Sequence, residues 1–211
     1  KLRPDFLDDY PEAIEEWDKS FPLSFGPVMW SSILVDSDHA HDKKTRRSIT
    51  GVIGFVGSTP VTWYSRRQGS IASSTYAAEF SALRTATEEA VSLRYMLRCL
   101  GYNVPIHRKC PTKVFGDNLS VIQNSSNPAA DLSKKHVAIS FHAVREAVAA
   151  GIVEPYWLRG KWNMSDIMTK QIPTTEFRFH CKYLFWSPEF HLYDKNLLDS
   201  DADSDKMEIE A

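Results

Sequence analysis

A long stripe of apolar residues in the middle of the chain restricts the folds that this sequence can adopt. The run Ser73-Ser74-Thr75 supplies residue types that cap helix N-termini, and Gly101 is typical of a helix end. Between them, apolar residues recur at the spacing of one helix face: Leu83, Ala86, Ala90, Leu93, Leu97 and Leu100. A single apolar face has to be buried against another layer of structure. We therefore expect a helix between Thr75 and Gly101 that packs on a sheet.

Strand-like and helix-like patterns alternate on both sides of this helix. Three predicted strands precede it, at 33–35, 50–57 and 60–66, and the turn-forming run G-S-T-P joins the last two in a hairpin. The elements predicted after it are a strand at 112–116, a helix at 118–125, a helix at 134–150, a strand at 152–158 and a helix near 163–170. Hairpin strands followed by helix-connected strands predict an α/β fold, in which a mixed sheet has helices on its faces.

The two ends of the chain differ from this central part. Residues 1–28 contain four prolines, which predicts a linker or arm with at most a short helix near 12–19. Residues 199–211 carry six acids and one base, which predicts an acidic disordered tail after a short extension at 174–198. Residues 21–198 hold 21 basic and 14 acidic side chains, although the whole chain has a net charge of −2. This basic body is compatible with a polyanionic partner and equally with an ordinary solvated surface.

Composition excludes several classes of protein. No stretch approaches the ~20 apolar residues of a membrane span, and the acidic, aromatic N-terminus does not resemble a signal peptide. Cys99, Cys110 and Cys181 lie far apart, which argues against a disulfide framework or a zinc site and favours a reducing compartment. The chain does not begin with Met, so we expect it to be a piece of a longer protein.

Acidic residues recur at the ends of the predicted elements. Asp36 ends the first strand, Asp117 ends the fourth, and Asp166 lies in the first turn of the last helix. Glu79 lies in line with the apolar stripe of the long helix, because steps of four and seven residues lead from it to Leu83 and Ala86. An inward-facing carboxylate is costly unless it is paired or binds a metal.

Each of these acids also has an ordinary explanation. Asp117 could cap the next helix, Asp166 could form a capping box with Asn163, and Asp36 could be a turn residue. Glu79 could pair with Arg84 or Arg94. Four carboxylates gathered at one sheet, however, favour Mg²⁺ or Mn²⁺ over zinc. Two such ions ~3.5–4 Å apart can activate water and stabilise the leaving oxygen of a phosphodiester, which indicates a nuclease.

An ordered series of motifs resembles the ribonuclease H domain of copia-type retrotransposon Pol polyproteins, which normally follows the reverse transcriptase. The motifs are V-D-S-D-H-A-H-D, T-R-R-S-I-T-G, T-W-Y-S-R-R-Q, S-S-T-Y-A-A-E-F, L-R-Y-M-L, F-G-D-N-L-S-V-I, K-K-H-V-A-I-S-F-H and N-M-S-D-I-M-T-K. The resemblance implies a domain at 29–173 with a five-stranded sheet of order 3-2-1-4-5 and helices on both faces. It also implies that the metal ligands are Asp36, Glu79, Asp117 and Asp166.

The same resemblance implies an activity and its partners. The expected reaction is two-metal hydrolysis of the RNA strand of an RNA–DNA hybrid during reverse transcription, leaving a 3′-hydroxyl and a 5′-phosphate. The expected cofactor is Mg²⁺, with Mn²⁺ as a substitute, and the expected partners are the hybrid and the upstream reverse transcriptase segment. The expected location is the cytoplasm, in virus-like particles, or the nucleus. The chain departs from the family pattern at Ala77, Gly116 and Gln171, and residues 158–166 lack the His that cellular enzymes of this fold carry.

Basic and polar residues supply candidate contacts to the hybrid, which proteins recognise by shape, phosphates and 2′-hydroxyls. The candidates are Arg46, Arg47, Arg66, Arg67, Gln68, Ser74, Thr75, Asn118, Lys134 and Lys135. Two other functions remain open. One is a non-catalytic nucleic-acid or protein binding module that kept the fold, and the other is an integrase or transposase. The pair His39 and His41 suggests zinc only weakly, because no further His or Cys spacing supports it.

Overall fold

The computed structural model describes residues 6–16, 18–106, 109–130 and 137–185. The chain divides into two units, residues 1–171 and residues 172–211. The smaller unit contributes one described helix, α6 (Thr174–Leu184). Lys134, Lys135 and the predicted acidic tail lie outside the described residues. None of the helices in the described ranges is long and apolar enough to cross a membrane.

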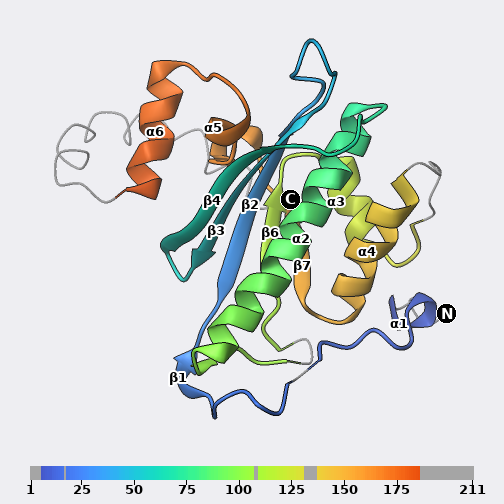
Figure 1. The fold of residues 1–211 in the computed structure, drawn as a ribbon, viewed down its shortest axis with the longest axis vertical. Helices are drawn as coiled ribbons and strands as arrows, with labels where there is room; N and C mark the ends of the chain where they lie inside the picture. The colour runs from blue at the N-terminus through green and yellow to red at the C-terminus, as the bar shows by residue number, and fades with distance from the viewer. Residues whose placement is uncertain (1–5, 17, 107–108, 131–136, 186–211) are drawn as a thin grey trace, which may run out of the picture. The chain divides into compact units, whose positions relative to one another are not determined.

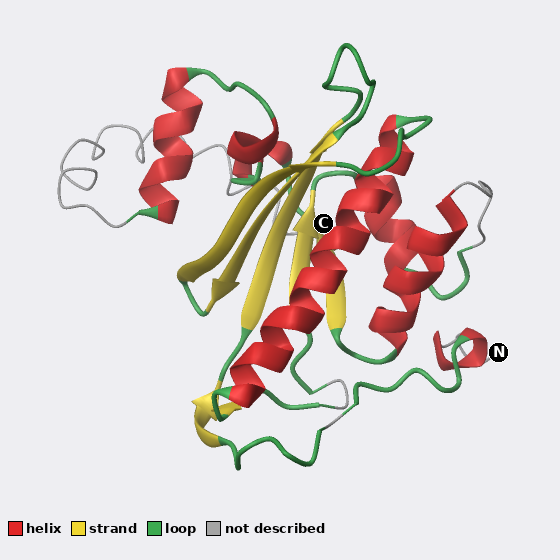
Figure 2. Ribbon diagram, viewed as in Figure 1, coloured by secondary structure: helices red, strands yellow, loops and turns green. Residues whose placement is uncertain are grey.

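A five-stranded mixed sheet forms the centre of the larger unit (Figures 1 and 2). Its strands are β2 (Ser31–Asp38), β3 (Ile49–Val56), β4 (Thr59–Arg67), β6 (Thr112–Gly116) and β7 (Val153–Trp157). Their spatial order is β4-β3-β2-β6-β7, with antiparallel pairing in the β2–β3–β4 meander and parallel pairing of β2 with β6 and β6 with β7. This arrangement confirms the expected order 3-2-1-4-5 of the five predicted strands.

Three helices cover one face of this sheet: α2 (Thr75–Cys99), α3 (Leu119–Ser126) and α4 (Ala138–Ala149). Figure 1 shows α2 lying across β2 and β6, as its apolar stripe predicts. The Ser74 hydroxyl caps this helix by accepting a hydrogen bond from the Ala77 amide at 3.2 Å. Gly101, with φ of +81°, follows its end in the left-handed conformation that glycine adopts most easily.

The two faces of β2 have different environments, because successive side chains of a strand point to opposite sides. Ile33 and Val35 face α2 and belong to the main core cluster, together with Phe80 and Leu83 of the helix. Asp36 and its β3 partner Gly51 face the other side, where α5 (Asp166–Thr169) packs on β2 and β3. Helices thus lie on both faces of the sheet, as expected.

Some predicted elements differ in extent from those observed. The only helical turn among the described residues before β2 is α1 (Phe6–Asp9), and the short helix that was allowed near 12–19 does not form in the described part of that range. Pro11 accounts for the end of α1, because a proline disfavours helical dihedrals at the preceding residue, here Tyr10. The last helix of the larger unit was predicted near 163–170 and is shorter, since only the 3₁₀ turn η2 (Gly160–Trp162) and α5 form there. A two-stranded parallel sheet of β1 (Phe25–Val28) and β5 (Tyr102–Asn103) was not predicted.

A buried ion pair ties the N-terminal segment to the last turns of α2. The Glu15 carboxylate accepts hydrogen bonds from Arg94 Nε at 2.6 Å and Nη2 at 2.8 Å, and Arg98 Nη1 lies 2.8 Å from the same group. All three side chains are buried. Arg94 also donates to the Cys110 and Pro105 carbonyl oxygens, so the cluster holds the loop after β5 as well.

We predict that Glu15→Ala destabilises the protein by ~3–5 kcal/mol, because it leaves two buried guanidinium groups without their carboxylate. Urea unfolding followed by circular dichroism measures the change. Glu16→Ala is the matched control, since Glu16 is the exposed neighbour and its loss is expected to change the unfolding free energy by less than ~0.5 kcal/mol. Equal effects of the two substitutions would contradict the structural role of the buried pair.

Candidate metal centre

Three aspartates from three different elements meet at one end of the sheet. Asp36 lies on β2, Asp117 directly follows β6, and Asp166 is the first residue of α5. One carboxylate oxygen from each lies within 4.8 Å of the others. The parallel strands β2 and β6 end at the same edge, which brings Asp36 and Asp117 together. The sequence therefore predicted three residues that the fold does bring together.

The segment that carries Asp166 is fixed to β2 by hydrogen bonds. The Asn163 amide donates to the Val35 carbonyl oxygen at 2.9 Å, and the Asn163 side-chain oxygen accepts from the Ser165 hydroxyl at 2.5 Å. The Thr169 hydroxyl donates directly to the Asp36 carboxylate. Asn163 therefore holds the segment against the sheet instead of forming a capping box with Asp166.

Helix capping does not explain Asp117, and an arginine partner does not explain Glu79. Asn118, and not Asp117, caps α3, because its side-chain oxygen accepts from the Val121 amide at 3.2 Å. The two arginines proposed as partners of Glu79 have other partners: Arg84 binds Glu88 at 2.8 Å, and Arg94 binds Glu15.

Glu79 lies beside the three aspartates without joining their closest group. It is buried in the first turns of α2, and its oxygens are not among those within 4.8 Å of one another in the described residues. Burial, followed by the negative charges of Asp36 and Asp117, raises the pKa of Glu79 to about 9. The same causes, burial first and then the charge of Asp36, raise the pKa of Asp117 and raise that of Asp166 to about 7. These shifts show that the carboxylates repel one another in a poorly solvated site.

A lysine that the sequence analysis did not select enters this cluster. Lys170 Nζ lies 2.9 Å from Asp166 Oδ2 and 3.9 Å from Asp36 Oδ2. Its position four residues after Asp166 was a usable signal, because residues at this spacing are neighbours on a helix. Thr169 was missed as well, and its contact with Asp36 joins residues that are 133 positions apart.

The residues at this site fit a divalent cation. Asp166 Oδ1 is buried and has no hydrogen-bond partner among the described residues, which leaves one oxygen free to act as a ligand. Carboxylate oxygens without nearby sulfur or imidazole ligands suit Mg²⁺ or Mn²⁺. Among the described residues, His39 and His41 do not belong to a group of three or more potential metal ligands, and they contact the Ala72 carbonyl oxygen and Asp38 respectively.

The candidate substrate residues have different environments. Arg46, Arg47 and Arg66 are exposed, and Arg67 donates to Asp42 at 2.8 Å. Gln68 is buried, where its amide donates to Thr50 Oγ1 at 3.0 Å and to the Ala78 carbonyl oxygen at 2.9 Å. Ser74 and Asn118 cap α2 and α3, and Thr75 is the first residue of α2.

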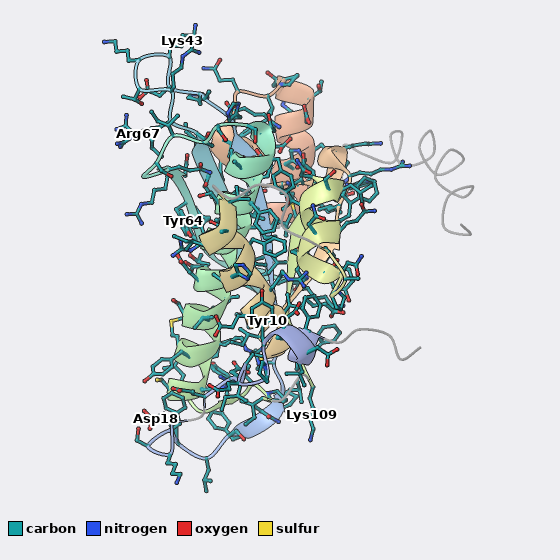
Figure 3. All side chains as sticks on the ribbon, turned by 90° about the vertical axis from the view of Figure 1, so that its right-hand side faces the viewer. Tyr10, Asp18, Lys43, Tyr64, Arg67 and Lys109 are labelled. Atoms are coloured by element: carbon teal, nitrogen blue, oxygen red, sulfur yellow. The ribbon has the colours of Figure 1, made fainter. Side chains whose placement is uncertain are left out.

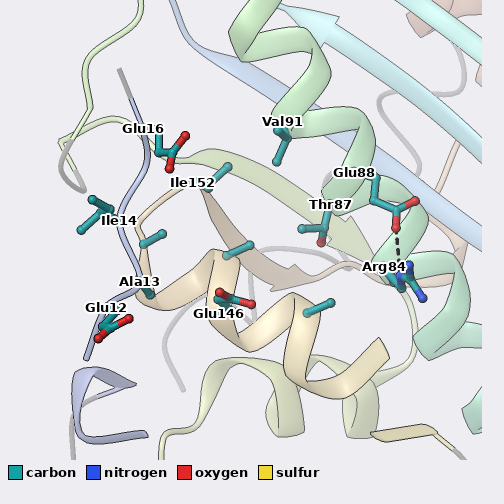
Figure 4. Close-up of a pocket in the computed structure, with 13 residues that line it drawn as sticks. Glu12, Ala13, Ile14, Glu16, Arg84, Thr87, Glu88, Val91, Glu146 and Ile152 are labelled. Carbon is teal, nitrogen blue, oxygen red and sulfur yellow. Dashed lines mark hydrogen bonds and ion pairs between the residues drawn. The ribbon is translucent and has the colours of Figure 1, made fainter. Parts of the chain in front are cut away.

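A cavity of about 380 Å³ lies away from these acids, between the N-terminal segment, α2 and α4 (Figure 4). Four glutamates line it, among them Glu88, which is paired with Arg84. None of the three clustered aspartates lines this cavity. Its lining is acidic and partly apolar, so it is poorly suited to a nucleic acid.

Known proteins resemble this chain in sequence. No model of a known protein family matches it. It is 27% identical over 143 residues to "Retrovirus-related Pol polyprotein from transposon RE1" of Arabidopsis thaliana, covering 68% of this chain and 10% of that protein. It is 30% identical over 149 residues to the corresponding polyprotein from transposon TNT 1-94 of Nicotiana tabacum, covering 71% of this chain and 11% of that protein. The chain thus spans about a tenth of the length of the curated relatives that it matches.

Solved structures resemble it in fold. The N-terminal RNase H domain of Rv2228c from Mycobacterium tuberculosis, fused to maltose-binding protein, matches 67% of this chain and 91% of that chain, with a TM-score of 0.50 and 14% identity. LC11-RNase H1 from compost matches 66% of this chain and 92% of that chain, with a TM-score of 0.51 and 12% identity. The chain has the ribonuclease H fold and is homologous to retrovirus-related Pol polyproteins from transposons. These comparisons confirm the resemblance to the ribonuclease H domain of Pol polyproteins that the ordered motifs indicated.

We predict that the stability of the metal-free protein falls as pH rises, and that Glu79→Gln weakens this dependence. Between the ordinary pKa of 4.5 and the folded value of about 9, Glu79 keeps a proton in the folded state that the unfolded chain has released. The stability that this proton provides is complete below pH 4.5 and is lost as pH rises through about 9. Melting temperatures in EDTA, measured across this range, should diverge by ~5 °C or more at the alkaline end, with the variant higher. Parallel curves would contradict the assignment.

We predict that Gly51→Ala destabilises the protein by ~1–3 kcal/mol, because the added methyl group displaces the segment that carries Asp166. A Cβ atom at this position would lie 2.7 Å from Met168 Cβ and 2.8 Å from the Ser165 carbonyl oxygen. Gly69→Ala is the control, since nothing lies within 4 Å of a Cβ atom there. Urea unfolding of both variants measures the difference, and a neutral Gly51→Ala would show that α5 is not packed as described.

Proposed function

We propose that this domain is a metal-dependent endonuclease that hydrolyses the RNA strand of RNA–DNA hybrids during reverse transcription of a retrotransposon. The products would carry a 3′-hydroxyl and a 5′-phosphate. The observation that carries the proposal is the convergence of Asp36, Asp117 and Asp166 in a partly desolvated cluster. Its support is that the cluster lies on a ribonuclease H fold in a chain whose relatives are Pol polyproteins.

The residues of the cluster would hold two divalent cations. Two Mg²⁺ or Mn²⁺ ions supply an activated water and stabilise the leaving oxygen of the phosphodiester. Asp36 is adjacent to both other aspartates and would contribute to both ions. Glu79 and Asp117 would hold one ion, and Asp166 would hold the other. No side chain has to act as a nucleophile.

Two groups have to change state when cations bind. Glu79 carries a proton at neutral pH in the metal-free site and would release it, because the bound cation replaces the proton as the balancing charge. Lys170 would withdraw its ammonium group from Asp36 and Asp166 for the same reason. Its side chain is partly exposed, so it can move toward solvent.

The proposed substrate and partner follow from the same observations. A hybrid duplex has A-like geometry, and proteins bind such duplexes through phosphates and 2′-hydroxyls. Exposed arginines lie at the sheet end that carries the acids, since Arg66 pairs in register with Thr50, one position from the Asp36 partner Gly51. The proposed partner is a reverse transcriptase segment of the same polyprotein, because the matched relatives are retrovirus-related Pol polyproteins.

A non-catalytic hybrid-binding module is the second candidate. Binding alone does not require three mutually repelling carboxylates, and their repulsion destabilises the metal-free fold. This observation favours the enzyme over the binding module. It also favours the enzyme over a module that only docks a protein.

We predict that Asp36→Asn and Asp117→Asn each lower cleavage of a labelled RNA–DNA hybrid by at least ~100-fold while the protein stays folded. Each change removes one anionic ligand and also relieves repulsion, so stability should not fall. Asp38→Asn is the matched control, because Asp38 lies two residues beyond Asp36 on the same strand and contacts His41 instead of the cluster.

The assay compares Mg²⁺ with EDTA, and the hybrid with single-stranded and duplex RNA. Cleavage of the hybrid alone, only with metal, is the expected result. Wild-type rates in either variant would show that the metal ligands are assigned wrongly. Tight hybrid binding without any cleavage would support the binding module, and transfer of DNA ends would support an integrase.

A further inference from the structure

The loop between β2 and β3 is closed around one carboxylate, that of Asp42. Asp42 Oδ1 accepts hydrogen bonds from the amides of Lys44 at 2.9 Å and Thr45 at 3.2 Å. Asp42 Oδ2 accepts from the Thr45 hydroxyl at 2.7 Å and from Arg67 Nη1 at 2.8 Å. One side chain thus closes the loop on itself and joins it to the end of β4.

The backbone of this loop follows the same closure. The Arg46 amide donates to the Asp42 carbonyl oxygen at 2.7 Å, and the Asp42 amide donates to the Arg47 carbonyl oxygen at 3.2 Å. Arg46 has a φ of +56°, a left-handed conformation that is uncommon for residues with a side chain. The hydrogen bonds around Asp42 therefore hold the backbone of Arg46 in this left-handed conformation.

The closed loop displays basic side chains. Residues 42–47, which we call the basic arm, include Lys43, Lys44, Arg46 and Arg47, all exposed. Figure 3 shows Lys43 and Arg67 at one end of the larger unit, with Asp18 and Lys109 at the opposite end.

The loop that carries the arm leaves the sheet close to the acid cluster. Asp36 pairs with Gly51, and two positions further Asp38 pairs with Ile49, which in turn pairs with Arg67. Two residues of strand correspond to ~7 Å, so the base of the loop and Arg67, the partner of Asp42, lie near the cluster, and the arm extends beyond them. A nucleic acid strand that reaches the cluster can therefore also contact the arm.

The negative charge of Asp42 opposes the binding of a polyanion, so its presence in the loop needs a structural explanation. Asp42 places this charge among four basic residues. The Thr45 hydroxyl, and then the Thr45 and Lys44 amides, hold the pKa of Asp42 well below its usual range, so the charge is present at neutral pH. The hydrogen bonds that this carboxylate accepts from the loop and from Arg67 supply that explanation, because they set the shape of the arm.

We propose that Asp42 is a positioning residue that shapes the basic arm into a binding site for the phosphates of the nucleic-acid substrate. Exposed lysines and arginines at fixed positions neutralise phosphates and give binding its salt dependence. The proposal rests on the proposed function, since it names the part of the domain that would hold the hybrid.

The test depends on whether Asp42→Ala strengthens or weakens binding to the hybrid. Asp42→Ala makes the protein more positive by one charge, so electrostatics alone would strengthen binding to a hybrid. Loss of the arm's shape would weaken binding in spite of that added charge. Asp18→Ala is the control with the same change of charge, because Asp18 is exposed at the opposite end of the larger unit (Figure 3).

The experiment uses the full chain and a fluorescent RNA–DNA hybrid, with anisotropy measured in EDTA at several NaCl concentrations. We expect Asp42→Ala to weaken binding roughly 5- to 10-fold and to reduce the salt slope by about 1, while Asp18→Ala leaves binding unchanged or slightly tighter. Asp42→Asn should fall in between, because its amide oxygen still accepts from the Lys44 and Thr45 amides. In cleavage assays KM should rise while kcat changes little.

A second comparison separates the arm from general effects on the fold. In an Arg46→Gln/Arg47→Gln background, Asp42→Ala should weaken binding less than it does in the wild-type background, because two of the four basic residues through which it acts are gone. Asp42→Ala that binds the hybrid as tightly as wild type, or more tightly, overturns the inference. Full additivity with the arginine changes overturns it too. Wild-type protein that neither binds the hybrid nor cleaves it with Mg²⁺ overturns the proposed function instead.

Discussion

Electrostatic repulsion among carboxylates is the constraint on which the architecture of the larger unit depends. Asp36, Asp117 and Asp166 come from three elements, and none would remain near the others without the hydrogen bonds that fix those elements. β2 is bonded on both sides, to β3 and β6, so Asp36 cannot move away along the sheet. The Asn163 and Thr169 contacts hold the third acid against it. Such unfavourable proximity in a folded protein is typical of a functional site.

Sequence reasoning recovered the features that have a local signature. The apolar stripe of α2 recurs at regular spacing, and Asp117 and Asp166 lie at element boundaries, so these features could be selected directly. Asp36 was selected as the end of a strand, although β2 continues for two more residues to Asp38. The strand order came from the family resemblance and not from periodicity. Contacts between distant residues left no such pattern: Arg94 and Glu15 are 79 positions apart, and Thr169 and Asp36 are 133 apart. Residues that act through such contacts therefore appeared only in the structure.

α2 carries buried ionisable side chains near both of its ends. Its first turns carry Glu79, which faces the acids of the sheet, and its last turns carry Arg94 and Arg98, which bind Glu15. The helix between them is packed into the main core. A segment whose prolines predicted an arm thus supplies a carboxylate to the buried part of the larger unit, and the C-terminal end of the helix is held by an ion pair as well as by packing.

The position of Lys170 has a consequence for ion selection. Its ammonium group is attached to the chain, so it stays near Asp36 and Asp166 at an effective concentration that dissolved ions do not match. Any ion that enters between these carboxylates has to displace this tethered cation. A monovalent ion offers no more charge than the ammonium group already there, whereas a divalent ion offers twice as much to the same oxygens. In the proposed function, this competition with its own side chain would make the site discriminate against Na⁺ and K⁺ before coordination geometry contributes.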